Sequence, residues 1–341
     1  MFNDKVIFIT GGTGSFGKMA VKMILERFAP RKLIVFSRDE LKQFEMAQEF
    51  NHPCMRYFLG DVRDLARLRE AMQGVDYVIH AAALKQVPAA EYNPMECIKT
   101  NVYGAENVVK ASLEAGVKQV VALSTDKAAN PINLYGATKL LSDKLFVSAG
   151  YWGGGKPTKF SVVRYGNVVG SRGSVLPFFY ERLRRGEREL PITDERMTRF
   201  WITLEQGVEM VLTAFACMQG GETFVPKIPS IRIVDLARAM DPTATVRLVG
   251  IRPGEKVHEL LCPKDNARDT IEFPEFFIIK PTVNFLKTVD YTRNPLGQTG
   301  FHVDEDFEYS SDSNPHFMTV SEIADLNARL QFSLPQTQTA S

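Results

Sequence analysis

The first 165 residues alternate between short apolar runs and longer segments in which apolar residues recur every three or four positions. A continuous apolar run is typical of a parallel strand that is covered on both faces. Such runs predict strands at 5–10, 33–36, 56–59, 76–80, 119–123 and 160–164. The periodic segments predict helices at about 18–27, 64–72, 94–115 and from 134 onward. This alternation predicts an α/β fold with a doubly wound parallel sheet.

Beyond residue 165 the pattern becomes less regular. A strand at 223–226 is expected to return to the main sheet, and a helix at 233–240 to follow it. We therefore expect a ligand-binding α/β domain that comprises 1–165 and about 203–228. A smaller α/β domain is expected to comprise about 166–202 and 229–330, and the polar tail 331–341 is expected to fray.

Composition excludes several function classes. The 41 basic and 40 acidic residues give a formal net charge of +1, so no bulk charge attracts nucleic acid or a membrane surface. Four scattered cysteines show neither a C-x-x-C pair nor metal-ligand spacing, which predicts free thiols and no metal site. No apolar stretch approaches the ~20 residues that span a bilayer, and the N-terminus lacks a signal core. We therefore expect a cytoplasmic protein.

A glycine-rich loop lies between the first predicted strand and the first predicted helix. Gly11, Gly14 and Gly17 form a G-x-x-G-x-x-G pattern. Glycine lets a backbone approach a pyrophosphate closely, and a helix N-terminus offers free N–H groups and a positive dipole end. This strand–loop–helix context predicts a dinucleotide site. The same loop contains Thr13, Ser15 and Phe16.

The end of the second strand bears on which dinucleotide binds. An NAD site usually places an acidic residue there, but this chain has Ser37 followed by Arg38. A hydroxyl and a guanidinium suit a 2′-phosphate, which favours NADP, with Lys42 as a further cation. Asp39 and Glu40 leave NAD open.

Two further strand ends are expected to face the cofactor. Asp61 and Val62 suit the adenine edge, although Asp61 is equally suited to cap the helix that begins near 64. Ala81 begins a run of three alanines that permits close approach along the cofactor.

Acid, base and cation candidates gather in the stretch 123–139. Thr125, Asp126 and Lys127 follow the strand at 119–123, and Tyr135 precedes Lys139 by four residues. The i, i+4 spacing places Tyr135 and Lys139 on one helical face. The plain alternatives are a surface tyrosine–lysine pair and a loop that Asp126 and Lys127 merely cap.

The glycine motif together with Tyr135-x-x-x-Lys139 resembles the extended short-chain dehydrogenase/reductase family. Within it, the segments 37–42, 124–130, 164–172, 197–202 and 251–256 resemble the inverting UDP-N-acetylglucosamine 4,6-dehydratases over essentially the whole chain. Thr125-Asp126-Lys127 is the most specific match, because retaining sugar-nucleotide dehydratases carry Asp-Glu at this place. The group includes the enzyme that opens pseudaminic acid biosynthesis, whose product decorates flagellin.

The resemblance implies an NADP-dependent hydro-lyase with a Rossmann domain and a UDP-sugar domain. The implied reaction oxidises C4 transiently, eliminates water across C5–C6, returns a hydride to C6 and inverts C5, giving UDP-2-acetamido-2,6-dideoxy-beta-L-arabino-hex-4-ulose. Tyr135 is the implied base at the 4-hydroxyl, with Thr125 bonded to the same group. Lys139 is expected to lower the tyrosine pKa and hold the nicotinamide ribose. Lys127 is expected to be the base at C5, and Asp126 the acid at C6.

The resemblance also implies substrate contacts. Arg199 and Arg252 are the diphosphate candidates, because a guanidinium binds phosphate oxygens bidentately. The implied substrate positions are Lys85, Asn167, Val175, Arg199, Arg252 and Glu255, and Lys85 also faces the cofactor. A homo-oligomer built from dimers is implied, because the family commonly pairs helices corresponding to 94–115 and 134–148.

Two other functions fit parts of the sequence. A UDP-sugar epimerase would use the same tyrosine, lysine and cofactor, but Asp126-Lys127 argues for elimination. A non-catalytic NADP-sensing regulatory module would not need the complete set of Asp126, Lys127, Tyr135 and Lys139.

Overall fold

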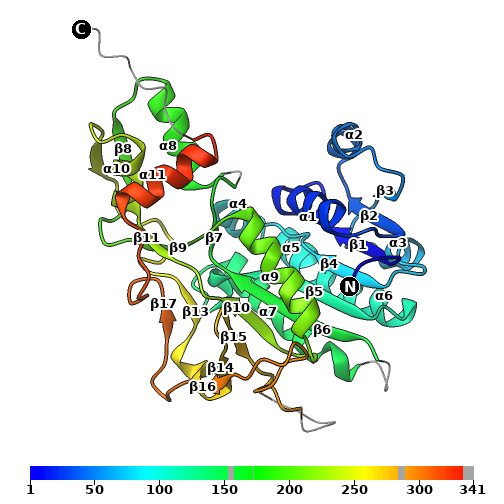
Figure 1. Ribbon diagram of the computed structural model, residues 1–341. Helices are drawn as coiled ribbons and strands as arrows, with labels where there is room; N and C mark the ends of the chain where they lie inside the picture. Colours follow the sequence, from blue (N-terminus) through cyan, green and yellow to red (C-terminus); the bar gives the residue numbers. More distant parts are fainter. Residues whose placement is uncertain (153–156, 172, 283–288, 333–341) are drawn as a thin grey trace. The chain divides into compact units, whose positions relative to one another are not determined.

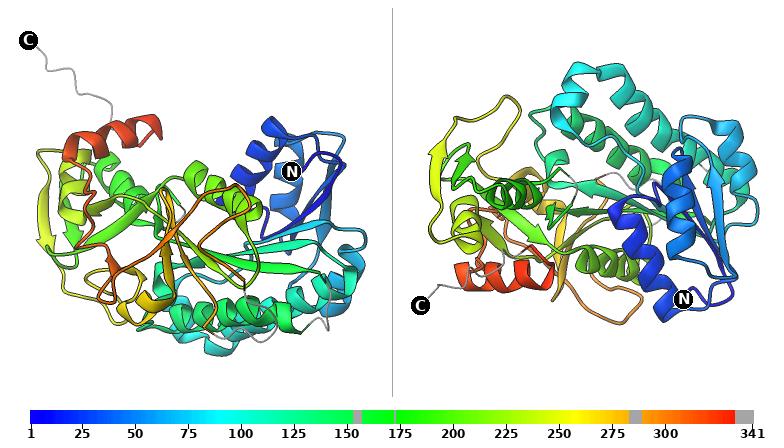
Figure 2. Two further views of the ribbon diagram at one scale, coloured as in Figure 1. Left: turned by 60° about the horizontal axis from the view of Figure 1, so that its bottom comes forward. Right: turned by 90° about the horizontal axis from the view of Figure 1, so that it is seen from above.

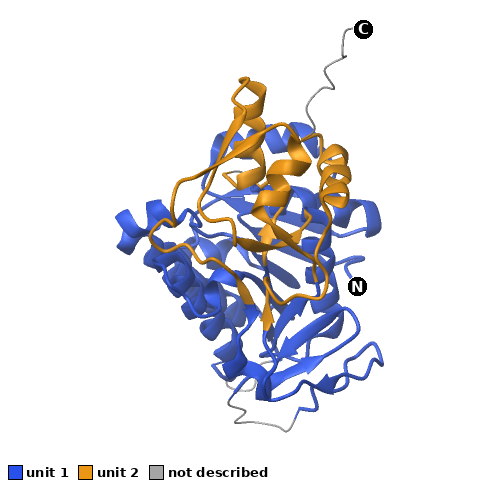
Figure 3. Cartoon of the chain, turned by 90° about the vertical axis from the view of Figure 1, so that its left-hand side faces the viewer, with its two compact units in different colours: residues 1–165, 204–227, 261–308 blue, residues 166–203, 228–260, 309–341 orange. Residues whose placement is uncertain are grey.

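The chain folds into two compact units, each assembled from three separate stretches of sequence. A computed structural model describes residues 1–341 except 153–156, 172, 283–288 and 333–341. Unit 1 comprises Met1–Tyr165, Leu204–Lys227 and Leu261–Glu308, and unit 2 comprises Gly166–Thr203, Ile228–Leu260 and Tyr309–Ser341 (Figure 3). The polar tail expected to fray lies, from 333 onward, outside the described residues.

Unit 1 is built on a ten-stranded sheet (Figure 1). Its strand order is β16-β14-β15-β10-β6-β5-β4-β1-β2-β3, and the seven strands from β10 to β3 pair in parallel. The parallel strands are β1 (Val6–Thr10), β2 (Lys32–Ser37), β3 (Met55–Leu59), β4 (Tyr77–His80), β5 (Gln119–Thr125), β6 (Lys159–Tyr165) and β10 (Thr223–Pro226). The predicted doubly wound parallel sheet is confirmed.

Helices cover both faces of this sheet, which is why its strands are apolar throughout. One face carries α1 (Ser15–Arg27) packed against α9 (Leu204–Cys217), and the other carries α3, α6 and α7 (Figure 2). Phe8 belongs to the core beneath α6 and α7, whereas its neighbours Ile7 and Ile9 are buried on the opposite side. The helices on that second face are α3 (Leu65–Ala71), α6 (Gly104–Ala115) and α7 (Leu134–Ser148). Unit 1 also contains α2 (Glu40–Glu49), α4 (Val87–Tyr92), α5 (Pro94–Ile98) and the 3-10 turns η2 (Asp126–Ala128), η3 (Ala149–Tyr151) and η4 (Lys264–Asp269).

The helix expected at 94–115 is interrupted. A π-helical turn, Lys99–Tyr103, separates α5 from α6. Asn101 within this turn is buried, and its amide exchanges two hydrogen bonds with the main chain of Leu84. π-turns inside helices often mark functional sites. Here the turn anchors the segment that follows β4.

One domain boundary was predicted wrongly. We expected 229–330 to belong to the smaller domain, but Leu261–Glu308 is part of unit 1. The reason is strand pairing: β15 (Phe276–Ile279) pairs antiparallel with β10, and β14 (Thr270–Glu272) and β16 (Phe301–His302) extend the sheet beyond it. These strands of two to four residues are too short to give a clear periodic signal.

The described part of unit 2 holds small sheets and three helices. β11 (Ser230–Arg232), β9 (Thr198–Ile202) and β7 (Asn167–Val168) form one sheet, and β12 (Thr245–Leu248) and β8 (Glu189–Ile192) form another. Its core includes Leu176, Trp201 and Ile323. The helices are α8 (Val175–Arg184), α10 (Ile233–Met240), whose predicted bounds are confirmed, and α11 (Val320–Arg329). Two short strands, β13 (Leu260–Cys262) and β17 (Tyr309–Ser310), complete the described elements. No described helix has the length and apolar character that crossing a membrane requires.

Candidate active site

The glycine loop after β1 passes against the segment after β4. Gly11 has a positive φ of 66°, and a Cβ added there would lie 2.8 Å from the nitrogen of Ala82. Only glycine tolerates both the left-handed backbone and this approach. The glycine loop therefore contacts the main chain of the alanine run that begins at Ala81, and the close approach of that run to the cofactor stays a prediction.

The start of α1 is open to an anion. Gly14 is the N-cap residue and gives no side-chain cap, and the first turn holds no acidic residue. A Cβ on Gly17 would lie only 2.3 Å from the carbonyl oxygen of Gly12, so α1 packs directly on the loop. Uncapped N–H groups at a helix start suit a phosphate. This cradle fits the pyrophosphate of a dinucleotide, and Thr13, Ser15 and Phe16 lie within it.

Thr10 and His80 hold the two segments together. The Thr10 hydroxyl oxygen accepts hydrogen bonds from the N–H groups of Ala81 and Ala82, both at 3.2 Å, and lies 2.8 Å from His80 Nδ1. Burial lowers the pKa of His80 to about 3, with a smaller contribution from the charge of Lys139. His80 is therefore neutral and structural. Sequence reasoning missed Thr10, because its partners are about 70 residues away.

The end of β2 presents cations and engages its acids elsewhere. Arg38 is half exposed, and its guanidinium lies 3.4 Å from Asp61. Asp39 caps α2 by accepting from the N–H of Lys42, and it also pairs with the Lys42 ammonium. Those two hydrogen bonds lower the pKa of Asp39. Because Asp39 already has these partners, a ribose hydroxyl would have to compete for it, whereas Arg38 is accessible.

Asp61 does not cap α3. Its carboxylate accepts from the main-chain N–H of Arg63 at 2.9 Å and from the Arg63 guanidinium at 2.7 Å. The cap of α3 is Asp64, which accepts from the N–H of Arg67. Of the two roles weighed for Asp61, the capping role is excluded, and the adenine contact remains a prediction. Val62 beside it is buried.

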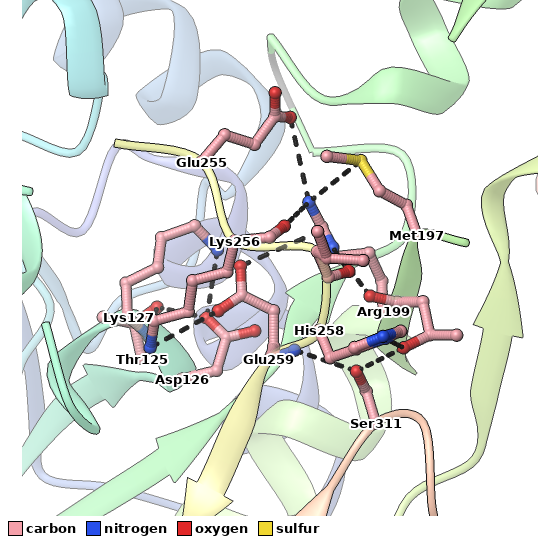
Figure 4. A network of polar contacts seen from close by, with 12 residues as sticks. Thr125, Asp126, Lys127, Met197, Arg199, Glu255, Lys256, His258, Glu259 and Ser311 are labelled. Carbon is pink, nitrogen blue, oxygen red and sulfur yellow. Dashed lines mark hydrogen bonds and ion pairs between the residues drawn. The ribbon is translucent and has the colours of Figure 1, made fainter. Parts of the chain in front are cut away.

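Thr125, Asp126 and Lys127 converge where β5 ends (Figure 4). The Thr125 hydroxyl donates to Asp126 Oδ1 at 2.9 Å, and the Lys127 ammonium donates to the same oxygen at 3.0 Å. Asp126 is 1% exposed, and its Oδ2 has no hydrogen-bond partner among the described residues. A buried carboxylate oxygen without a partner is unfavourable unless it is protonated or binds a ligand.

Tyr135 lies beside this cluster at the start of α7. Its phenol is hydrogen-bonded with Thr125. Burial raises the pKa of Tyr135 to about 12, and the nearby Lys127 charge opposes this only in part. The Lys139 ammonium instead donates to the carbonyl of Leu123 at 2.7 Å. The protein's own groups thus do not lower the tyrosine pKa, because desolvation outweighs the nearby cation. A lower pKa from Lys139 together with the positive nicotinamide stays a prediction.

Lys85 follows the alanine run. It is exposed, and its pKa is lowered by desolvation and by the charge of Lys127, so the two ammonium groups influence each other. The preceding Leu84 is fixed by Asn101 of the π-turn, with hydrogen bonds of 2.8 and 2.9 Å. Sequence reasoning missed Asn101, for which an asparagine within a predicted helix was the only signal.

In unit 2, Arg199 is buried, and both of its Nη nitrogens already have main-chain partners (Figure 4). Nη1 donates to the carbonyls of Thr198 at 2.7 Å and Val257 at 2.9 Å, and Nη2 donates to that of Lys256 at 3.0 Å. These bonds leave little capacity for a diphosphate. Arg199 is better explained as the residue that fixes the segment around 256–257.

Arg252 and Glu255 form an exposed ion pair in the same unit. The Arg252 guanidinium donates to both carboxylate oxygens at 3.1 and 3.0 Å, and its side chain is 71% exposed. Burial favours a higher pKa for Glu255, but the hydrogen bonds from Arg252 reverse this and lower it. Arg252 therefore remains a candidate for an anionic ligand. Asn167 has a buried amide oxygen without a partner in the described chain, and Val175, the first residue of α8, packs against the core of unit 2.

Within the described ranges, no group of three or more His, Cys, Asp or Glu side chains is arranged to hold a metal ion. All four cysteines are buried and free.

Comparison with known proteins identifies the family. Residues 7–281 match the family model described as polysaccharide biosynthesis protein. The chain is 59% identical over 327 residues to "UDP-N-acetylglucosamine 4,6-dehydratase (inverting)" of Campylobacter jejuni subsp. jejuni serotype O:2, covering 96% of this chain and 98% of that protein. It is 44% identical to "UDP-glucose 4-epimerase" of Rickettsia massiliae, over 82% of this chain and 84% of that protein.

A solved structure agrees with this assignment over nearly the whole chain. The X-ray structure of Pen from Bacillus thuringiensis matches with a TM-score of 0.87 and 36% identity, covering 97% of this chain and 99% of that one. The chain therefore belongs to the polysaccharide biosynthesis protein family, within the extended short-chain dehydrogenases/reductases.

Proposed function

We propose that this chain is an inverting UDP-N-acetylglucosamine 4,6-dehydratase, a hydro-lyase. The observation that carries the proposal is the contact between Lys127 and Asp126, a base and an acid 3.0 Å apart beside a tyrosine. A relative named for this activity is 59% identical over nearly the whole chain. Simple C4 epimerisation needs neither group, whereas elimination of water needs both.

The glycine cradle supports a bound nicotinamide dinucleotide, and we propose NADP. Gly11, Gly14 and Gly17 would hold the pyrophosphate at the start of α1. Arg38 and Lys42 would meet the 2′-phosphate, because phosphate can replace the carboxylates that they now contact. When bound, the nicotinamide supplies the capacity to accept a hydride from C4 of the sugar and to return it to C6.

Tyr135 would take the proton of the sugar 4-hydroxyl. Its phenol is held by Thr125, so the hydroxyl of the substrate would be placed between two oxygens of the protein. Burial raises the pKa of Tyr135 to about 12, so the phenolate form requires positive charge beyond what the protein supplies. The positive charge of an oxidised nicotinamide is of the required sign.

Lys127 and Asp126 would perform the elimination. The reaction needs a neutral Lys127 to remove the C5 proton and a protonated Asp126 to donate to the departing C6 hydroxyl. The ion pair of Lys127 and Asp126 holds as many protons as the neutral pair that the reaction needs. Moving one proton from Nζ to Oδ1 along the 3.0 Å contact converts the ion pair into two neutral groups. Removing the C5 proton and protonating the hydroxyl then restores the ion pair. A desolvated site favours the neutral pair.

We propose that cations bind the anionic part of the substrate. Lys85 is exposed, and its ammonium suits a phosphate oxygen. Arg252 is exposed as well, and its guanidinium suits phosphate oxygens. Arg252 would exchange its Glu255 partner for phosphate, while Asn167 and Val175 would contact other parts of the UDP-sugar. We also propose that the protein is cytoplasmic and forms a homo-oligomer. We propose that its product is used in pseudaminic acid biosynthesis and flagellin glycosylation.

Solvent exchange at C5 tests the proposed chemistry. The wild-type protein with UDP-N-acetylglucosamine in D₂O is expected to give a 4-keto-6-deoxy sugar that carries deuterium at C5, seen by NMR. Lys127→Ala should retain cofactor binding but lose this exchange. Normal C5 exchange in that variant would remove Lys127 from the base role.

Epimerisation is the second candidate, because a 4-epimerase is 44% identical to this chain. An epimerase would return a UDP-hexose that keeps its C6 hydroxyl. The same NMR spectrum therefore distinguishes the two activities by the signal of the C6 methyl group, which only dehydration produces.

A further inference from the structure

A buried carboxylate lies one turn beyond Lys139, and the reaction described above does not use it. Tyr135, Lys139 and Asp143 occupy positions i, i+4 and i+8 of α7, so they share one face of the helix. Asp143 is only 3% exposed. A carboxylate at this depth is costly unless it is paired and hydrogen-bonded, so its partners are informative.

Asp143 is bonded to two adjacent strands of the sheet. Its Oδ2 accepts from the Ser124 hydroxyl at 2.7 Å and from the Arg164 guanidinium at 3.2 Å. Ser124 of β5 and Arg164 of β6 are direct partners in the sheet register. The next pair along these strands is Thr125 and Tyr165. One carboxylate thus connects α7 to the ends of both strands, immediately before the residues of the acid–base cluster.

The charge of Asp143 also acts on Lys139. Burial lowers the pKa of Lys139, and the Asp143 carboxylate opposes that effect. His80 on β4 interacts with the charge of Lys139. On β6, Tyr165 interacts with Tyr135, and Arg164 is bonded to Asp143 itself. Asp126 and Lys127 of η2 act on Tyr135. Of these groups, Asp143 is the anion that directly favours the charged form of Lys139.

We propose that Asp143 is a positioning residue for the oxidation step: it keeps the buried Lys139 protonated and fixes α7 against the ends of β5 and β6. Arg164 and Ser124 are its supports, because they hold the carboxylate in place and satisfy its lone pairs. This inference rests on the proposed function, since it assigns a charge to the lysine that accompanies the catalytic tyrosine.

The test compares three variants. Asp143→Asn keeps the shape and removes the charge, and Asp143→Glu keeps the charge. Glu222→Gln is the matched control, because Glu222 is a fully buried carboxylate that bonds Ser161 and two main-chain N–H groups. The first readout is the titration of Lys139 in the protein without ligands, followed by NMR of ¹³C-labelled lysine and assigned with Lys139→Arg. The second is the pH dependence of kcat for the 4-keto-6-deoxy product.

In Asp143→Asn we expect the Lys139 titration and the alkaline limb of kcat to move down by about one pH unit, with KM unchanged. Asp143→Glu should restore both, and Glu222→Gln should leave both in place while lowering Tm. Coincident wild-type and Asp143→Asn titrations would overturn the inference. If that variant does not fold, the comparison moves to an Arg164→Gln background, which removes the buried cation that would be left without its partner. Equal Lys139 titrations in Arg164→Gln and in Arg164→Gln with Asp143→Asn would also overturn the inference. A wild-type protein without 4-keto-6-deoxy product would instead refute the proposed function, and the NMR titration would still decide the role of Asp143.

Discussion

Replacing Gly17 with alanine should weaken cofactor binding through a displacement of α1. The added Cβ would lie 2.3 Å from the carbonyl oxygen of Gly12, whereas ordinary contact begins at 3.4 Å. The helix and the loop must therefore separate by about 1.1 Å. Both are main chain, so no side chain can rotate to relieve the overlap. Overpacking of this kind costs about 2 kcal/mol, which corresponds to roughly a 30-fold rise in Kd if the loss falls on the pyrophosphate cradle.

The assay is a fluorescence titration of the purified variant with NADPH, run beside a titration with NADH and a thermal melt. Gly150→Ala is the control, because a Cβ there meets nothing within 4 Å and its φ is not positive. We expect wild-type Kd and Tm for the control, and a higher Kd for Gly17→Ala at a temperature where it remains folded. A folded Gly17→Ala protein with wild-type affinity would refute the account of the loop as a cofactor cradle.

Other substitutions separate structural from ligand-binding roles. Arg199→Ala should lower the free energy of unfolding by about 3 kcal/mol in urea, because three carbonyls in buried or partly buried surroundings each lose a hydrogen bond from a buried guanidinium. Arg252→Ala should change the free energy of unfolding by less than about 1 kcal/mol, yet raise KM for the UDP-sugar. Equal losses of stability in the two variants would contradict a structural role for Arg199 and a ligand-binding role for Arg252. His80, with a folded pKa of about 3 against 6.5 unfolded, contributes stability that is present above pH 6.5 and lost as the pH falls toward 3. The free energy of unfolding of the wild type should therefore fall by about 2 kcal/mol between pH 6.5 and about pH 5. In His80→Asn this contribution to the pH dependence of the free energy of unfolding should be absent.

The local parts of the site were predictable from sequence. Asp126 and Lys127 are neighbours in the chain, and the four-residue spacing of Tyr135 and Lys139 is set by helix geometry, so their proximity needs no tertiary information. The central strands were equally accessible, because a strand covered on both faces must be apolar along its whole length.

Contacts between distant segments were not predictable. Asp143 is hydrogen-bonded to Ser124 and Arg164, which lie about 20 residues before and after it in the sequence, and no sequence motif predicts these contacts. From the sequence, Arg199 is a candidate for the diphosphate because it carries a guanidinium. The sequence does not show that this guanidinium donates to the carbonyls of residues 256 and 257. Such partners depend on how a separate loop is folded, which periodicity does not encode.

The interleaving of the two units has a consequence for biosynthesis of the chain. The polypeptide passes from one unit to the other five times, and the main sheet receives its last strand only at Phe301–His302. During synthesis from the N-terminus, the parallel strands from β3 to β6 are available early, but β10 lacks its outer neighbour until β15 has been made. The edge of the nascent sheet thus stays unpaired while many further residues are added, and exposed edges favour pairing with other chains. A fragment that ends before residue 270 should therefore aggregate during expression, even though it contains every residue of the acid–base cluster.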